Sequence, residues 1–173
     1  TAGVVRRHRG WAHCATLQGK IAPGDLGAIL VETGYWYNNA LVGWERNFQG
    51  SGVQERVVEK HSYPNVYKYR TTLMGNEDKR YGFLTSLQSK AELVRMTSEA
   101  MRDGDWTSPD KELLEQYRTL QDLGENRYDT SNLDLTIADM LCMVARPQMS
   151  RGGPTAAKRN GNQRYGIPRY MRK

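Results

Sequence analysis

Residues 37–50 read YNNALVGWERNFQG, and this stretch decides the fold. Its middle, residues 40–44, is a short apolar run between turn-forming residues, which is typical of a buried strand in an α/β sheet. Glu45 follows directly, and open sheets place their ligands at the carboxyl ends of their strands. The pattern therefore predicts a strand that delivers a carboxylate to a site. The alternative is a strand-terminal acid that forms an ion pair with Arg46 or another surface cation.

Length and charge narrow the class of protein. The 173 residues suffice for one domain with a sizeable core, and 25 Lys and Arg against 19 Asp and Glu give a formal charge of +6. A basic chain favours a polyanionic partner. Seven of the cations and none of the acids lie in residues 151–173, which are rich in Gly, Pro and Asn. We therefore predict one folded domain, residues 1–147, and a basic flexible tail, residues 148–173.

Two further features bear on the compartment. Cys14 and Cys142 are too few for a disulfide framework, which favours a reducing compartment. No apolar run is long enough to cross a membrane, so no membrane partner is expected.

Periodicity predicts the elements around the central strand. We expect two antiparallel strands within residues 3–17, and helices over residues 23–33, 52–61, 89–102, from 108 onward, and 131–146. Gly34 is expected to end the first helix, and Ser89 to open a later one as part of a capping box. His13 and Cys14 are adjacent in a strand and so point to opposite faces, which argues against a shared metal site.

Two segments have alternative interpretations. Residues 71–86 are polar and contain glycine, which indicates a hairpin or loop. Lys79 and Arg80 could contact a phosphate backbone there, or simply be solvated. Asp134 could be a catalytic acid, or the third-position acid of a capping box that begins at Ser131.

The order of these features resembles the nuclease domain of the large terminase subunit of tailed bacteriophages, which has an RNase H-like fold. The resemblance runs over residues 4–147 and is most specific in YNNALVGWERNFQGSG, which is similar to the family's Tyr-Asn, strand, Glu-x-Asn and Gly pattern. Tyr63-Pro64, the GFLT of residues 82–85 and Lys90 add weaker matches. The resemblance implies an α/β fold, with an RNase H-like mixed sheet flanked by helices.

The resemblance also implies a site. In that family three acidic groups hold two divalent metal ions, Mg²⁺ or Mn²⁺, that cut DNA. Glu45 matches the acid at the end of the central strand, and Asp134, four residues before Ala138, matches the second acid of an Asp-Asp-x-x-x-Ala pattern. Leu133 stands in place of the first acid of that pair, and Asp129 or Asn132 is a weak substitute.

A DNA-packaging function follows as an expectation. The resemblance implies a metal-dependent endonuclease that cuts concatemeric phage DNA, with the portal protein and the small terminase subunit as partners and a homo-oligomer in the full-length protein. It would act in the cytoplasm of the infected bacterial host and transiently at the portal vertex of the procapsid. DNA contacts are expected from Asn47, Lys79, Arg80, Arg159 and Arg164.

One departure limits the resemblance. The family's first catalytic Asp lies on a strand before the hairpin, whereas the first acid in this chain is Asp25, at a helix start. The ATPase domain's phosphate-binding loop is also not matched. We therefore expect a partial domain that lacks its first strand, begins inside a larger protein and cuts DNA poorly alone. The alternatives are a non-catalytic DNA- or portal-binding module, or another RNase H-like nuclease such as a resolvase.

Overall fold

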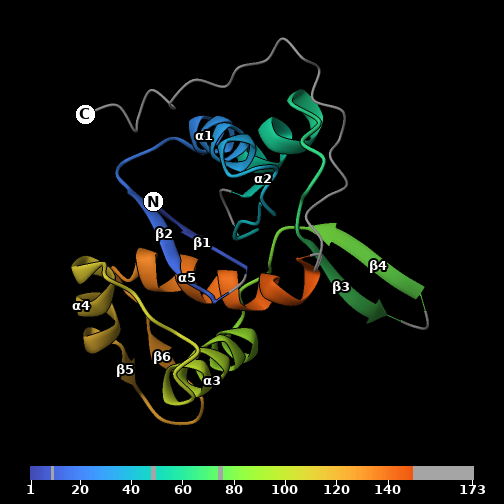
Figure 1. Ribbon diagram of the computed structural model, residues 1–173. Helices are drawn as coiled ribbons and strands as arrows, with labels where there is room; N and C mark the ends of the chain where they lie inside the picture. Colours follow the sequence, from blue (N-terminus) through green and yellow to red (C-terminus); the bar gives the residue numbers. More distant parts are fainter. Residues whose placement is uncertain (9, 48–49, 74–75, 150–173) are drawn as a thin grey trace. The chain divides into compact units, whose positions relative to one another are not determined.

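The chain has a mixed α/β fold with small antiparallel sheets. A computed structural model describes residues 1–8, 10–47, 50–73 and 76–149 (Figure 1). The chain divides into two compact units. Unit 1 comprises Thr1–Lys20 and Leu84–Arg146, and unit 2 comprises Ile21–Phe83 and the described residues from Pro147 onward. None of the described helices has the length and apolar character needed to cross a membrane.

Unit 1 is built on a hairpin and three helices. Strands β1 (Ala2–Arg6) and β2 (His13–Gln18) pair antiparallel, with Ala2 opposite Gln18 and a register shift between Val5 and Arg6. Helix α5 (Asp134–Ala145) packs against β1, and α3 (Leu87–Arg102) and α4 (Lys111–Thr119) pack against α5 (Figure 1). A short ribbon of β5 (Gln121–Asp122) and β6 (Tyr128–Asp129) links α4 to α5.

Unit 2 packs helices against an extended run. Its elements are α1 (Pro23–Trp36), α2 (Gly50–Gln54), the π-helix η1 (Glu55–Lys60), and the antiparallel hairpin β3 (Lys68–Leu73) and β4 (Asn76–Tyr81). The hairpin alternative for residues 71–86 is therefore confirmed. A short 3₁₀ helix, η2 (Arg146–Gln148), begins at the boundary between the units. The core cluster comprises Val31, Val42, Trp44, Val53, Val57, Tyr63 and Val66.

The expected central strand is an extended run shared between two partner segments. Val42 forms a parallel bridge with Val66, and Glu45 forms one with Phe83. Val42 N–H donates to Asn65 O at 2.9 Å, and Phe83 N–H donates to Trp44 O at 2.8 Å. Because each end of the run pairs with a different segment, no regular ladder forms along it. The parallel arrangement of these bridges is established, and an RNase H-like sheet stays a prediction.

Two asparagines turn the chain from α1 into this run. Asn38 and Asn39 both have φ of 59°, in the left-handed region that Asn tolerates better than most residues. Asn65 Nδ2 donates to Asn39 O at 2.7 Å and so ties this turn to the neighbouring segment. The Tyr-Asn-Asn sequence before the apolar run therefore has a backbone role.

Gly34 does not end α1, because the helix continues to Trp36. Gly34 is buried, and a Cβ at this position would lie 2.6 Å from Tyr63 Cζ. Tyr63 packs edge-on against Tyr35 and donates its hydroxyl hydrogen to Ala40 O at 2.7 Å. The glycine is therefore a packing requirement inside the helix.

Replacing Gly34 by Ala tests this contact. Ala favours a helix by about 1 kcal/mol over Gly, but overpacking against Tyr63 costs about 1–3 kcal/mol, so we expect a net loss in the free energy of unfolding. Urea denaturation measures it. Gly24→Ala in the same helix is the matched control, because nothing lies within 4 Å of its Cβ position, and it should be neutral or stabilising. Equal effects in the two variants would contradict the packing requirement.

A buried ion pair lies at the centre of unit 1. Arg6 Nε lies 2.5 Å from Asp139 Oδ1, and both side chains are almost fully buried. Asp139 Oδ2 accepts hydrogen bonds from Trp106 Nε1 at 2.7 Å and Tyr117 Oη at 2.9 Å. Burial and the Asp139 carboxylate raise the pKa of Tyr117, so its hydroxyl stays protonated and donates. The carboxylate is thus saturated by donors from β1, α4 and the segment before α4.

The Arg6 guanidinium is held in the same way. Its Nη1 donates to Trp11 O and to Thr107 O, both at 2.9 Å. Its Cζ lies 4.9 Å from the centroid of the Trp106 ring. These contacts offset part of the desolvation that a buried ion pair costs, and Arg6 Nη2 has no hydrogen-bond partner among the described residues.

Replacing Asp139 by Asn should lower the free energy of unfolding by about 3–5 kcal/mol, because Arg6 keeps its charge in a buried site without a counter-ion. The double replacement of Arg6→Met with Asp139→Leu should recover most of that loss. Urea denaturation followed by tryptophan fluorescence measures both. Arg118→Gln, which breaks an exposed pair with Glu115, is the control and should change stability by less than about 0.5 kcal/mol. If Asp139→Asn also lost less than about 0.5 kcal/mol, the role of the buried pair would be contradicted.

Candidate functional site

Glu45 lies at the end of the extended run in unit 2 and is half-buried. Its neighbours hold its backbone on both sides, because Trp44 O accepts from Phe83 N–H and Arg46 N–H donates to Phe83 O at 2.7 Å. Asn47 Nδ2 donates to Glu45 Oε1 at 3.0 Å. This contact holds the Glu45 carboxylate and gives the Glu-x-Asn spacing a physical reason.

The glycine after this motif also has a packing reason. Gly50 N–H donates to Asn47 O at 3.0 Å, and a Cβ on Gly50 would lie 2.7 Å from Glu45 O. Only glycine lets the chain pass this close to the Glu45 carbonyl. The turn that begins α2 therefore depends on the same residues that hold Glu45.

Asp134 lies in unit 1 as the first residue of α5. The capping-box interpretation is wrong, because the helix begins at Asp134 itself and no side chain caps it at Leu133. The free N–H groups of the first turn, those of Leu135 and Thr136, donate instead to Gln116 Oε1 at 3.0 and 3.2 Å. The Asp134 side chain is 58% exposed, and Oδ2 lies 2.8 Å from the amino group of Thr1.

The other predicted ligands and DNA contacts are dispersed. Asp129 lies in β6 and accepts from Ser131 N–H at 2.8 Å; the Ser131 backbone and hydroxyl lower the pKa of this carboxyl. Lys79 and Arg80 lie in β4, opposite Arg70 and Tyr69 in β3. Arg159 and Arg164 lie outside the described residues.

The predicted site also requires ligands for a metal ion. Among the described residues, no three His, Cys, Asp or Glu side chains group closely enough to hold a metal ion. Glu45 and Asp134 belong to different units, so their convergence stays a prediction. Each has carboxylate oxygens of the kind that Mg²⁺ prefers, but two carboxylates alone do not complete a two-metal site.

Nothing in the sequence marked two groups of α5 as structural. Asp139 is the fully buried acid of α5, and its donors leave no room for a metal. Cys142, on the same helix, has a thiol whose pKa burial and the nearby Asp139 carboxylate raise to about 12. This thiol is therefore protonated at neutral pH and does not act as a nucleophile. The opposite orientations predicted for His13 and Cys14 are confirmed, since the burial of β2 alternates along the strand.

His13 belongs to a hydrogen-bonded relay that joins β2 to the start of α4. Thr16 Oγ1 is in short contact with Asp110 Oδ2, and His13 Nε2 lies 2.8 Å from Thr16 Oγ1. On the other side of the ring, Ser108 Oγ lies 3.0 Å from Nδ1 and accepts from Asp110 N–H at 3.1 Å. Since Asp110 accepts from Thr16, the imidazole donates through Nε2 and accepts at Nδ1.

The electrostatic surroundings favour the neutral ring. Burial, then the positive charge of Arg6, lower the pKa of His13 below its ordinary value of 6.5, while Asp139 and Asp110 oppose this shift less strongly. Desolvation alone would raise the pKa of Asp110, but its hydrogen bonds with Thr16 and the backbone outweigh that effect and lower it. The relay therefore pairs an anionic carboxylate with a neutral imidazole.

The comparisons with known proteins gave no match: no protein-family model, curated protein or solved structure is similar to this chain.

The lowered pKa of His13 predicts a pH-dependent stability. The unfolded chain binds a proton at His13 near pH 6.5, whereas the folded chain binds it only at lower pH, so the free energy of unfolding falls as pH decreases below about 6.5. Denaturant unfolding between about pH 7.5 and 5 should show this fall, and His13→Gln should reduce it. His61→Gln is the matched control at an exposed imidazole. An identical pH dependence in wild type and His13→Gln would contradict the prediction.

Proposed function

We propose that this chain is the nuclease domain, or part of it, of the large terminase subunit of a tailed bacteriophage, with an RNase H-like arrangement. In this proposal it cuts double-stranded DNA in the cytoplasm of an infected bacterium and at the portal vertex, beside the portal protein and the small subunit. The observation that carries the proposal is the position of Glu45. It ends an extended run bridged in parallel to two segments, and Asn47 holds its carboxylate at 3.0 Å.

Both proposed metal ligands lie on well-held backbone. Glu45 is fixed by the hydrogen bonds of Trp44 and Arg46 to Phe83. Asp134 begins a helix whose first N–H groups bond to the buried Gln116. Bound divalent ions would supply an activated water and stabilise the leaving oxygen in phosphodiester hydrolysis. The protein's part is to present carboxylates in fixed directions, as Glu45 and Asp134 do.

A third carboxylate is needed to complete such a site. The resemblance places this first acid on a strand that precedes the hairpin.

A non-catalytic DNA-binding module is the second candidate. The observation that favours it is that the described residues gather no group of three metal-ligating side chains. In that case the acids are structural, and the basic residues carry the function. The two candidates differ in whether DNA is cut once the upstream segment is present.

We expect the 173-residue chain to nick plasmid DNA negligibly with Mg²⁺ or Mn²⁺, and a chain extended upstream through the preceding strand to nick it readily. In the longer chain, Glu45→Gln and Asp134→Asn should each reduce the rate by at least about 100-fold, since even partners of metal ligands cost roughly 10–100-fold. Glu59→Gln, at an exposed position of η1, is the matched control and should cut normally. Ready cutting by the short chain, or none by the longer one, would overturn the assignment of the site.

A further inference from the structure

A solvent-open cavity of about 400 Å³ lies in unit 2, and its described lining comes from three elements. Arg46 follows the extended run, Gln54 ends α2, and Arg80 and Tyr81 end β4. Its volume falls within the range of roughly 300–1,000 Å³ that is usual for ligand sites. Among the described lining residues, two are cations and none is an acid, so the cavity favours an anion.

Arg46 is the residue that most needs a ligand there. Its Nη1 is buried and has no hydrogen-bond partner within the described part of the chain. A buried guanidinium N–H without a partner is costly, because it loses its bonds to water and gains none from protein. Because Arg46 lines the cavity, an anionic oxygen bound there would accept from its guanidinium. The planar guanidinium of arginine matches the oxygens of a phosphate group particularly well.

Further positive charge and a polar face surround the same place. Lys68 Nζ lies 5.5 Å from the centroid of the Tyr81 ring, so a third cation flanks the cavity. Arg80 is exposed, and Gln54 adds an amide that can donate to a phosphate oxygen. The cavity is open rather than enclosed, which suits a polymer whose backbone passes over it better than a small metabolite that must be surrounded.

We infer that the cavity lined by Arg46, Gln54, Arg80 and Tyr81 binds a backbone phosphate of duplex DNA. This inference rests on the proposed function for its ligand. Glu45 is not among the described residues that line this cavity, although Arg46 follows it directly in the chain. The cavity therefore holds a phosphate other than the one that Glu45 would serve, and Arg46 contributes to DNA binding rather than to bond cleavage.

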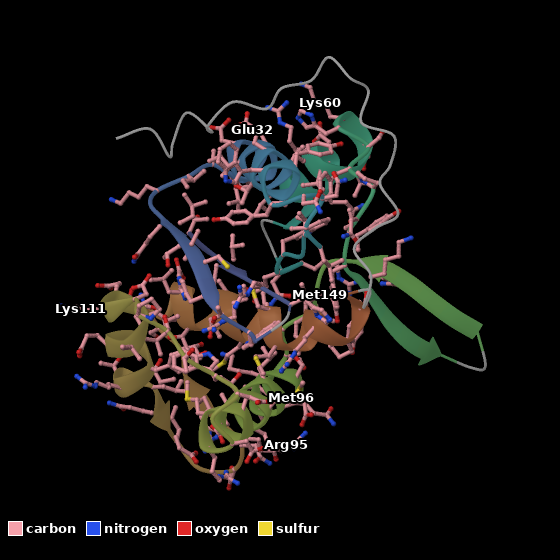
Figure 2. All side chains as sticks on the ribbon, viewed as in Figure 1. Glu32, Lys60, Arg95, Met96, Lys111 and Met149 are labelled. Atoms are coloured by element: carbon pink, nitrogen blue, oxygen red, sulfur yellow. The ribbon has the colours of Figure 1, made fainter. Side chains whose placement is uncertain are left out.

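The test measures binding of the 173-residue chain to a short labelled DNA duplex of mixed sequence, in EDTA, by fluorescence anisotropy between about 50 and 200 mM salt. Arg46→Gln should raise Kd by about tenfold and reduce the slope of log K against log salt by about 1, because one phosphate contact is lost. Arg46→Lys should keep the slope, since the charge remains. Lys60→Gln is the matched control, an exposed cation of the same unit outside the cavity (Figure 2), and should change Kd much less.

Two further measurements keep the outcome clear. Arg80→Gln should reproduce the loss of slope at an exposed position where folding is not at risk, and circular dichroism checks that each variant is folded. Titration with inorganic phosphate at constant ionic strength separates a free-phosphate site from a DNA site. An unchanged slope in Arg46→Gln and Arg80→Gln, or binding of phosphate without any effect on DNA, would overturn the inference.

The inference and the proposed function fail separately. Nicking by the longer chain reports on the proposed function, whereas the salt slope of DNA binding in EDTA reports on the cavity. Loss of slope in Arg46→Gln without any nicking would support the cavity in a DNA-binding module and reject the nuclease. Nicking that depends on Glu45, with an unchanged slope in Arg46→Gln, would support the nuclease and reject the cavity.

Discussion

The pairing of residues 40–46 with two different segments is the constraint on which unit 2 depends. The run exchanges hydrogen bonds with Asn65 and Tyr67 at Val42, and with Phe83 at Trp44 and Arg46. Trp44 and Val42 point into the core between the helices, so the backbone can satisfy its own polar groups only through these partners. The same bonds fix the backbone of Glu45 and Arg46, which places a carboxylate and a guanidinium at adjacent positions.

Unit 1 depends on a charge pair where unit 2 depends on backbone pairing. Arg6 of β1 and Asp139 of α5 lie in the contact between the hairpin and the helix, and Trp106 and Tyr117 complete the bonds of the carboxylate. Removing either charge leaves the other buried and unpaired. The residues at these two positions of β1 and α5 therefore depend on each other. Asp134, in the first turn of α5, remains exposed, whereas Asp139 has the structural role.

Local sequence determined the elements whose signals lie within a few residues. Pro23 begins α1 where it was expected, since its fixed φ suits a first helical turn. The alternation along β2 predicted that His13 and Cys14 point to opposite faces of the strand. The Glu-x-Asn spacing places Asn47 close enough to Glu45 for the hydrogen bond between their side chains. These signals need no information from distant parts of the chain.

Tertiary structure alone decided the roles that depend on distant partners. Gly34 reads as a helix end in the sequence, but it lies inside α1 because Tyr63 occupies the space of its side chain. Asp139 reads as polar and so as exposed, and only Arg6, far away in the chain, makes its burial favourable. The start of α5 was misplaced because Gln116, on another helix, satisfies its first N–H groups. Hydrophobic periodicity treats every charge as a surface residue, and the partner that overrides this rule exists only in the folded chain.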